Sequence, residues 1–227
     1  MIARVGAVVA LLFGLTAAVM PTTTVPPDSQ WPPLQMTWRT TSRTGSMAAP
    51  LVVTVAQSLQ YTDADSWTSE VIASDDTRPG ATAAGEQTVV DGDTVRVRPC
   101  ADCVVDERTR TKEAIASGVA PGQYERFADD VSVTKESVAS PLGLNLDAYR
   151  VEVPIQFPCV GIIAECAPGA AGAPAGLVNG HVPATETWTF VVLDSGTGAA
   201  VPVRHQIRVG DFAVEDTIVD SLEIPSS

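Results

Sequence analysis

Several segments of the chain alternate apolar and polar side chains with a period of two residues. The clearest is 149–157, where apolar residues alternate with Arg150, Glu152 and Gln156. Residues 201–209 repeat the pattern, and it is weaker around residue 53 and residue 95. Because successive side chains on a strand point to opposite faces, this pattern predicts antiparallel strands with one apolar and one solvated face. It constrains the fold more than any other feature of the chain.

Segments with β-strand character recur along most of the chain and are separated by turn-forming residues. Asp91-Gly92-Asp93 is typical of a hairpin, because Gly tolerates the positive φ that such turns require. Two short helices are expected at 109–117 and 123–133. We expect eight or nine strands in a mainly β fold, an antiparallel curved sheet or incompletely closed barrel with one or two short helices. The expected strands are 34–42, 51–62, 67–73, a hairpin around 89–95, 149–157, 185–193, 201–209 and 212–224.

Residues 1–20 have the composition of an export signal. Arg4 precedes a run of sixteen apolar or small residues, which is short for a membrane span and suits a signal peptide or an N-terminal anchor. The next segment, 21–33, contains five prolines and is expected to be a tether. Residues 34–225 are expected to form a single β domain with a Gly/Ala/Pro-rich loop at 158–184. The expected location is secreted or extracytoplasmic, with membrane tethering where the N-terminal segment is retained.

The chain is acidic, with 14 basic and 27 acidic residues and a net charge of −13 at pH 7. Such a surface repels phosphate backbones, so nucleic acid is not an expected partner. An apolar content of 45% with 18% charged residues is typical of a globular domain with a sizeable core. Solubility outside the cell is the simplest explanation of the acidic composition.

Four cysteines occur in two close pairs, Cys100 with Cys103 and Cys159 with Cys166. An even number in an exported chain predicts disulfides, and four cysteines allow three connectivities between which the sequence does not choose. A zinc site made by all four thiolates is the alternative, although the second pair is more widely spaced than in a zinc knuckle. A thioredoxin-like redox role is disfavoured because the chain has no βαβ rhythm around the first pair.

No pattern of residues predicts catalysis. The chain lacks a Gly-x-Ser-x-Gly motif, and Ser195 lies in an expected turn, where a hydroxyl forms local hydrogen bonds. His181 lies in a Gly-rich loop. His205 falls on the apolar side of its strand, where we expect a core histidine satisfied by a carbonyl group. No enzymatic activity, cofactor or metal is expected.

Three short segments resemble LolA-like and RseB-like proteins, a superfamily of exported lipoprotein carriers and sigma-factor regulators. They are the segments 61–71, 90–95 and 192–204, the last with an aspartate and a Thr-Gly turn before a Pro-Val-Arg strand. The resemblance implies an incompletely closed barrel with a concave apolar face that is partly covered by helices. The chain departs from this pattern in having no clear first helix after the signal and in the cysteine-bearing loop at 159–166.

A sheet with one apolar face needs a cover made of helices, loops or an apolar ligand. We therefore expect a non-enzymatic carrier or sensor that binds a lipid or an acylated protein on the concave face. The alternative is a structural or protein-interaction module of the cell envelope, with a filled core, no ligand and an envelope protein as partner. The residues expected to line the ligand site are Trp38, Val53, Trp67, Val95, Trp188 and Val203.

Overall fold

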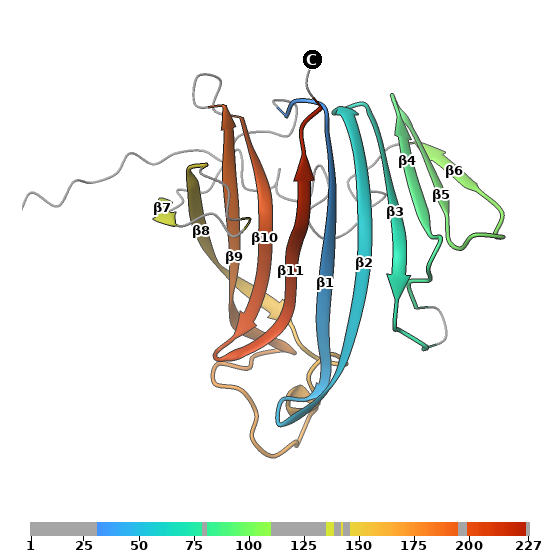
Figure 1. Ribbon diagram of the computed structural model, residues 1–227. Coiled ribbons are helices and arrows are strands. Elements are labelled where there is room, and N and C mark those ends of the chain that lie inside the picture. Colours follow the sequence, from blue (N-terminus) through green and yellow to red (C-terminus); the bar gives the residue numbers. More distant parts are fainter. Residues whose placement is uncertain are drawn as a thin grey trace, which may run out of the picture.

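The computed structural model describes residues 31–78, 81–109, 135–138, 142, 146–194 and 199–225. They form one curved antiparallel sheet of eleven strands in the order β6-β5-β4-β3-β2-β1-β11-β10-β9-β8-β7 (Figure 1). Within the described residues the edge strands β6 and β7 do not pair, so the sheet is not closed into a barrel. The predicted fold class, an open antiparallel sheet, is confirmed. The strands are β1 (Leu34–Ser46), β2 (Ala49–Asp63), β3 (Ser66–Ser74), β4 (Gln87–Asp91), β5 (Thr94–Arg98), β6 (Asp106–Thr109), β7 (Lys135–Val138), β8 (Ala148–Pro158), β9 (His181–Asp194), β10 (Ala199–Val209) and β11 (Phe212–Glu223).

All nine strands predicted from the alternating pattern are present, and β6 and β7 are additional. β6 has the sequence Asp-Glu-Arg-Thr with every side chain exposed, so no apolar alternation marks it. Its pairing with β5 defines it as a strand. The expected helix at 123–133 lies outside the described residues, as does that at 109–117 except for Thr109, which ends β6. In the described part of the chain the helical element is the short 3-10 helix η4 (Ala164–Cys166), and no helix there is long and apolar enough to cross a membrane.

Pairing between β1 and β11 joins the N-terminal and C-terminal strands into one sheet. β1 pairs along its whole length with β2 and also with β11, in a register that places Trp38 beside Gln57 and Val219. The other neighbours in the sheet follow as hairpins, so the strand order is that of two meanders joined at β1 and β11. Trp31, in the proline-rich segment before β1, is buried and packs its ring 5.3 Å from that of Tyr61.

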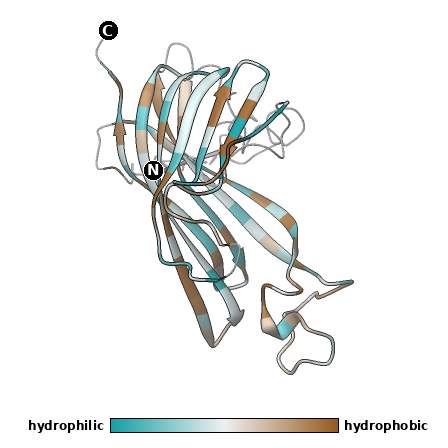
Figure 2. Ribbon diagram, turned by 90° about the vertical axis from the view of Figure 1, so that its right-hand side faces the viewer, coloured by the Kyte–Doolittle hydropathy of each residue, from teal (hydrophilic) through white to brown (hydrophobic). Residues whose placement is uncertain are grey.

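Hydrophilic and hydrophobic residues alternate along the strands (Figure 2), and since successive side chains point to opposite faces, the sheet has an apolar face and a polar face. In β1, Leu34, Met36 and Trp38 are at most 1% exposed, whereas Gln35 and Arg39 on the other side are exposed. We call the face that carries Trp38 the inner face. Most of its buried residues belong to one contiguous group, the main cluster, which consists of Trp31, Leu34, Met36, Trp38, Leu59, Tyr61, Trp67, Val90, Val95, Ala148, Tyr149, Val151, Val153, Trp188, Phe190, Val191, Ala200, Val201, Val203 and Val219.

The Gly/Ala/Pro-rich segment between β8 and β9 covers one end of the sheet, at the bottom of Figure 1. Its Ile162 carbonyl accepts a hydrogen bond from Gly45 N at 2.8 Å, and Glu165 accepts from Ser46 Oγ at 2.6 Å and from Met47 N. A second group of buried residues, the end cluster, lies here and consists of Phe157, Cys159, Ile163, Cys166, Val182, Ala184, Val209 and Val214.

The cysteines form two local disulfides, Cys100–Cys103 and Cys159–Cys166. The prediction of disulfides is confirmed, and the alternative of a zinc site made by all four thiolates is excluded. Cys159 and Cys166 are buried in the end cluster, so the second disulfide fixes the loop against the sheet.

Candidate functional site: the inner face of the sheet

All six residues predicted to line a ligand site are buried in this structure. Trp38, Trp67, Val95, Trp188 and Val203 lie together in the main cluster, although they come from five different strands. Val53 is also buried but belongs to neither cluster. The structure therefore brings five of the six together on the inner face.

The aromatic side chains of the inner face pack against one another on β8, β9 and β10. Tyr149 stacks on Phe190 with ring centroids 5.2 Å apart, and Trp188 lies 6.3 Å from Phe190. Trp188 also stacks on the imidazole of His205 at 4.1 Å. Burial raises the pKa of the Tyr149 hydroxyl well above its ordinary value, so this group stays neutral.

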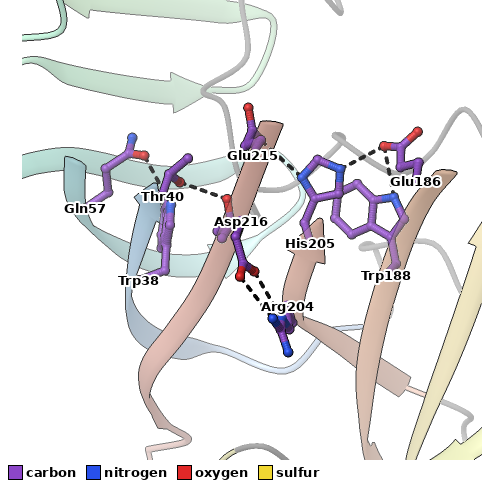
Figure 3. Close-up of polar contacts among 10 residues, drawn as sticks. Trp38, Thr40, Gln57, Glu186, Trp188, Arg204, His205, Glu215 and Asp216 are labelled. Atoms are coloured by element: carbon purple, nitrogen blue, oxygen red, sulfur yellow. Dashed lines mark hydrogen bonds and ion pairs between the residues drawn. The ribbon is translucent and has the colours of Figure 1, made fainter. Parts of the chain in front are cut away.

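A network of charged side chains interrupts this apolar surface (Figure 3). Glu186 Oε1 accepts hydrogen bonds from Trp188 Nε1 at 3.1 Å and from His205 Nε2 at 2.9 Å. His205 Nδ1 lies 3.3 Å from Glu215 Oε1, an ion-pair contact. We call Glu186, His205 and Glu215 the triad. Glu186 is fully buried and the side chain of His205 is 7% exposed, whereas that of Glu215 is 31% exposed.

His205 lies on the apolar face, as predicted, but the expectation that a carbonyl satisfies it is wrong. Its partners are carboxylates of the two neighbouring strands, Glu186 on β9 and Glu215 on β11. Burial of the imidazole lowers its pKa, but the contacts with Glu186 and Glu215 outweigh this effect, and the pKa of His205 is raised overall.

The triad lies between the two apolar clusters. Along β9, Phe190 and Trp188 belong to the main cluster, Glu186 follows on the same face, and Ala184 and Val182 belong to the end cluster. β10 repeats this order with Val203, His205 and Val209. A band of polar side chains therefore divides the inner face into a long apolar part and a shorter, disulfide-closed part.

Further polar groups of the inner face are paired within the sheet. Trp38 Nε1 donates to the buried Gln57 Oε1 at 3.1 Å, and the hydroxyls of Thr40 and Thr217 lie 2.9 Å apart (Figure 3). The indole N–H of Trp67, in contrast, is not paired: its Nε1 is buried and, among the described residues, has no hydrogen-bond acceptor.

A hollow of about 500 Å³ lies at the disulfide-closed end of the sheet. Apolar side chains provide most of its lining, and Asp211 is the charged residue among them. The lining residues are Met47, Pro174, Ala175, Val182, Pro183, Val209, Gly210, Asp211 and Phe212.

Sequence reasoning missed the triad carboxylates, although one of them leaves a signal in the sequence. Glu186 has the same two-residue phase as Trp188 and Phe190, so a charged residue on the apolar face could be read from the alternation. Glu215 could not be found in this way. The register of β10 with β11 shifts between Ile207 and Arg208, and this irregularity changes which side chains of β11 face inward.

These features define a class of structure, an open antiparallel half-barrel with an apolar inner face. No family model and no curated protein matches the sequence. Similar solved structures include LprF from Mycobacterium bovis (13% identity, 85% of this chain and 87% of that one, TM-score 0.37) and an uncharacterized conserved protein from Thermus thermophilus (11%, 85% and 80%, 0.39). A LolA superfamily protein from Nitrosomonas europaea is similar at 10% identity over 88% of this chain and 90% of that one, with a TM-score of 0.37.

One of these similar structures is that of a LolA superfamily protein, the superfamily named in the sequence resemblance. At these low identities and TM-scores, the likeness says nothing about what this chain binds. Function is therefore inferred from the chain's own residues.

Proposed function

We propose that this protein is an exported, non-enzymatic carrier or sensor that binds an amphiphilic ligand, a lipid or the acyl chain of a protein, on the inner face. The observation that supports this best is the main cluster itself. Its twenty buried residues are rich in aromatic side chains, and most of them lie along one face of a sheet that, in the described residues, does not close on itself. Concave, mostly apolar surfaces with a few polar groups are typical of small-molecule sites.

The indole N–H of Trp67 adds support. Leaving a buried donor without an acceptor costs about 1–3 kcal/mol, so such groups are rare in native proteins and call for a specific explanation. An acceptor oxygen of a bound ligand would complete this hydrogen bond. Trp67 lies level with Tyr61 and Val90 across the sheet, within the apolar part of the inner face.

In this proposal Trp38, Trp67, Val95, Trp188 and Val203 line the long apolar part of the site. Val53 pairs with Ser42, which in turn pairs with Glu215, so Val53 lies level with Glu215 and two residues nearer the disulfide-closed end than the level of His205. We therefore expect substitutions at Val203 to affect uptake of an apolar ligand more strongly than substitutions at Val53.

The second candidate function is an envelope interaction module with a filled core. The observation that favours it is the burial of Trp38 and Phe190, which are both 0% exposed without any ligand. For a carrier, this burial requires that ligand entry displace side chains that now cover the inner face. The two candidates therefore differ in whether the inner face can open.

The test is native mass spectrometry of protein purified without detergent, followed by solvent extraction, together with titration of the neutral fluorescent probe N-phenyl-1-naphthylamine. If the protein is a carrier, we expect an extractable amphiphile or saturable uptake of the probe. Val203→Asn should weaken probe uptake, whereas Ile218→Asn should not, because Ile218 is 38% exposed. Folded protein with neither ligand nor probe uptake would refute the carrier and favour the interaction module.

A further inference from the structure

When His205 is neutral, two hydrogen-bond acceptors of the triad face each other. Because an ionised carboxylate only accepts, the contact with Glu186 places the proton of the neutral imidazole on Nε2, which donates to Glu186. In the neutral imidazole Nδ1 then holds a lone pair, and this lone pair lies 3.3 Å from the Glu215 carboxylate. The contact lacks the geometry of a hydrogen bond, and Nδ1 is buried without such a bond among the described residues.

This arrangement calls for a shared donor. Two acceptors at this distance repel each other unless a proton on Nδ1 or a group with at least two hydrogens lies between them. With the imidazole neutral, the pair formed by His205 Nδ1 and the ionised Glu215 carboxylate carries a negative charge. A cation is therefore favoured and an anion disfavoured, and the effect is strengthened by the low dielectric of a buried site.

We propose that His205 Nδ1 and the Glu215 carboxylate form the headgroup subsite of the inner face, and that they bind the primary ammonium group of a long-chain amphiphile, which donates one hydrogen to each. This inference rests on the proposed carrier function and names the substrate class. The Glu215 side chain is 31% exposed, so a headgroup can approach its carboxylate from solvent, whereas contact with the buried Nδ1 requires that neighbouring side chains move. Glu186 and Trp188 position the imidazole from the other side and do not contact the headgroup.

The apolar part of the inner face is long enough for an extended chain. Thr40 pairs with Thr217 at the level of His205, and Leu34 is six residues before it on β1. At about 3.3 Å per residue this is roughly 20 Å of apolar surface. An acyl chain that begins at the triad can therefore lie along the main cluster.

A proton and the ammonium group compete for the same position. When Nδ1 is protonated, it donates to Glu215 itself, and the subsite is closed to a cation. The charged groups of the described residues that face the imidazole are Glu186 and Glu215, from the two strands beside β10. Ligand affinity should therefore fall as the pH is lowered.

The test uses the full exported protein and three ligands of equal chain length, dodecylamine, dodecanol and dodecanoate, which displace N-phenyl-1-naphthylamine at about pH 8 and about pH 5.5. At the higher pH we expect dodecylamine to bind at least about tenfold more tightly than the other two, as for a charge-assisted hydrogen bond, and its preference to shrink at the lower pH. Glu215→Gln should abolish the preference for the amine. Glu223→Gln is the matched control, since it removes the same charge from an exposed position of the same strand.

The outcomes separate the two proposals. If no probe enters the wild-type protein, the carrier function fails. If the probe enters but the three headgroups bind equally, or dodecanoate binds best, the headgroup subsite is refuted and the carrier function stands. Full amine preference in folded Glu215→Gln would also refute it. Even if Glu215→Gln does not fold, the binding of the three ligands to the wild-type protein at the two pH values tests the headgroup subsite.

Discussion

The buried contact between Glu186 and His205 gives the sharpest prediction about stability. Glu186 is fully buried and its Oε1 holds both His205 Nε2 and Trp188 Nε1. Removing one member of a buried ion pair takes from the other its closest charged partner, and such changes cost about 3–5 kcal/mol. We expect Glu186→Leu and His205→Leu each to lower the free energy of unfolding by this amount, a large fraction of the roughly 5–15 kcal/mol of a typical domain.

The double variant Glu186→Leu/His205→Leu should be more stable than either single one. It removes both charges and leaves the indole N–H of Trp188 without its acceptor, so the expected loss is only about 1–3 kcal/mol. The difference between this loss and the sum of the single losses measures the coupling.

The assay is urea unfolding followed by tryptophan fluorescence and by far-UV circular dichroism, with the disulfides intact. Coincident transitions and unchanged slopes are required before the free energies are compared. Single losses of less than about 1 kcal/mol, or a double loss equal to their sum, would show that these side chains do not form a coupled buried pair.

Two further predictions concern pH and the disulfides. Because the pKa of His205 is raised in the folded protein above its ordinary value of about 6.5, its contribution to stability should be complete below that pH and be lost as the pH rises through the folded-state pKa. The difference in free energy of unfolding between wild type and His205→Gln, measured across this range, should shrink with rising pH; a difference that grows would contradict the assignment. Replacing Cys159 and Cys166 by serine should cost about 2.5 kcal/mol from loop closure, and the Cys100/Cys103 pair about 2 kcal/mol. The loss of stability at Cys159 and Cys166 should exceed this value, because the two new serine hydroxyls would be buried in the end cluster. Thermal unfolding of the two double variants tests this order: a larger loss for the Cys100/Cys103 variant would contradict it.

Much of the sheet could be predicted from the sequence because strand alternation is a local property. Residues 149–157 and 201–209 show their inner faces directly, and the Asp91-Gly92-Asp93 turn marks its hairpin, with Gly92 at a φ of 57°. β6 could not be predicted, since its four exposed residues have no apolar phase and its partner β5 alone makes it a strand. The disulfides were predicted from the even number and close spacing of the cysteines and from the expectation of export, but their connectivity needed the structure.

The candidate site, too, could be predicted only in part from the sequence. The sequence alone determined an acidic chain with an antiparallel sheet and an inner face rich in Trp and Val, because periodicity and composition act residue by residue. Only the tertiary structure decided that β1 pairs with β11, that Glu186 and Glu215 flank His205, and that this triad divides the inner face into two apolar parts. These contacts join residues 10 and 19 positions apart or more than 170 apart, and they depend on strand register and on a shift near Ile207. A one-residue change in register moves every side chain of a strand to the opposite face, so no local pattern could specify them.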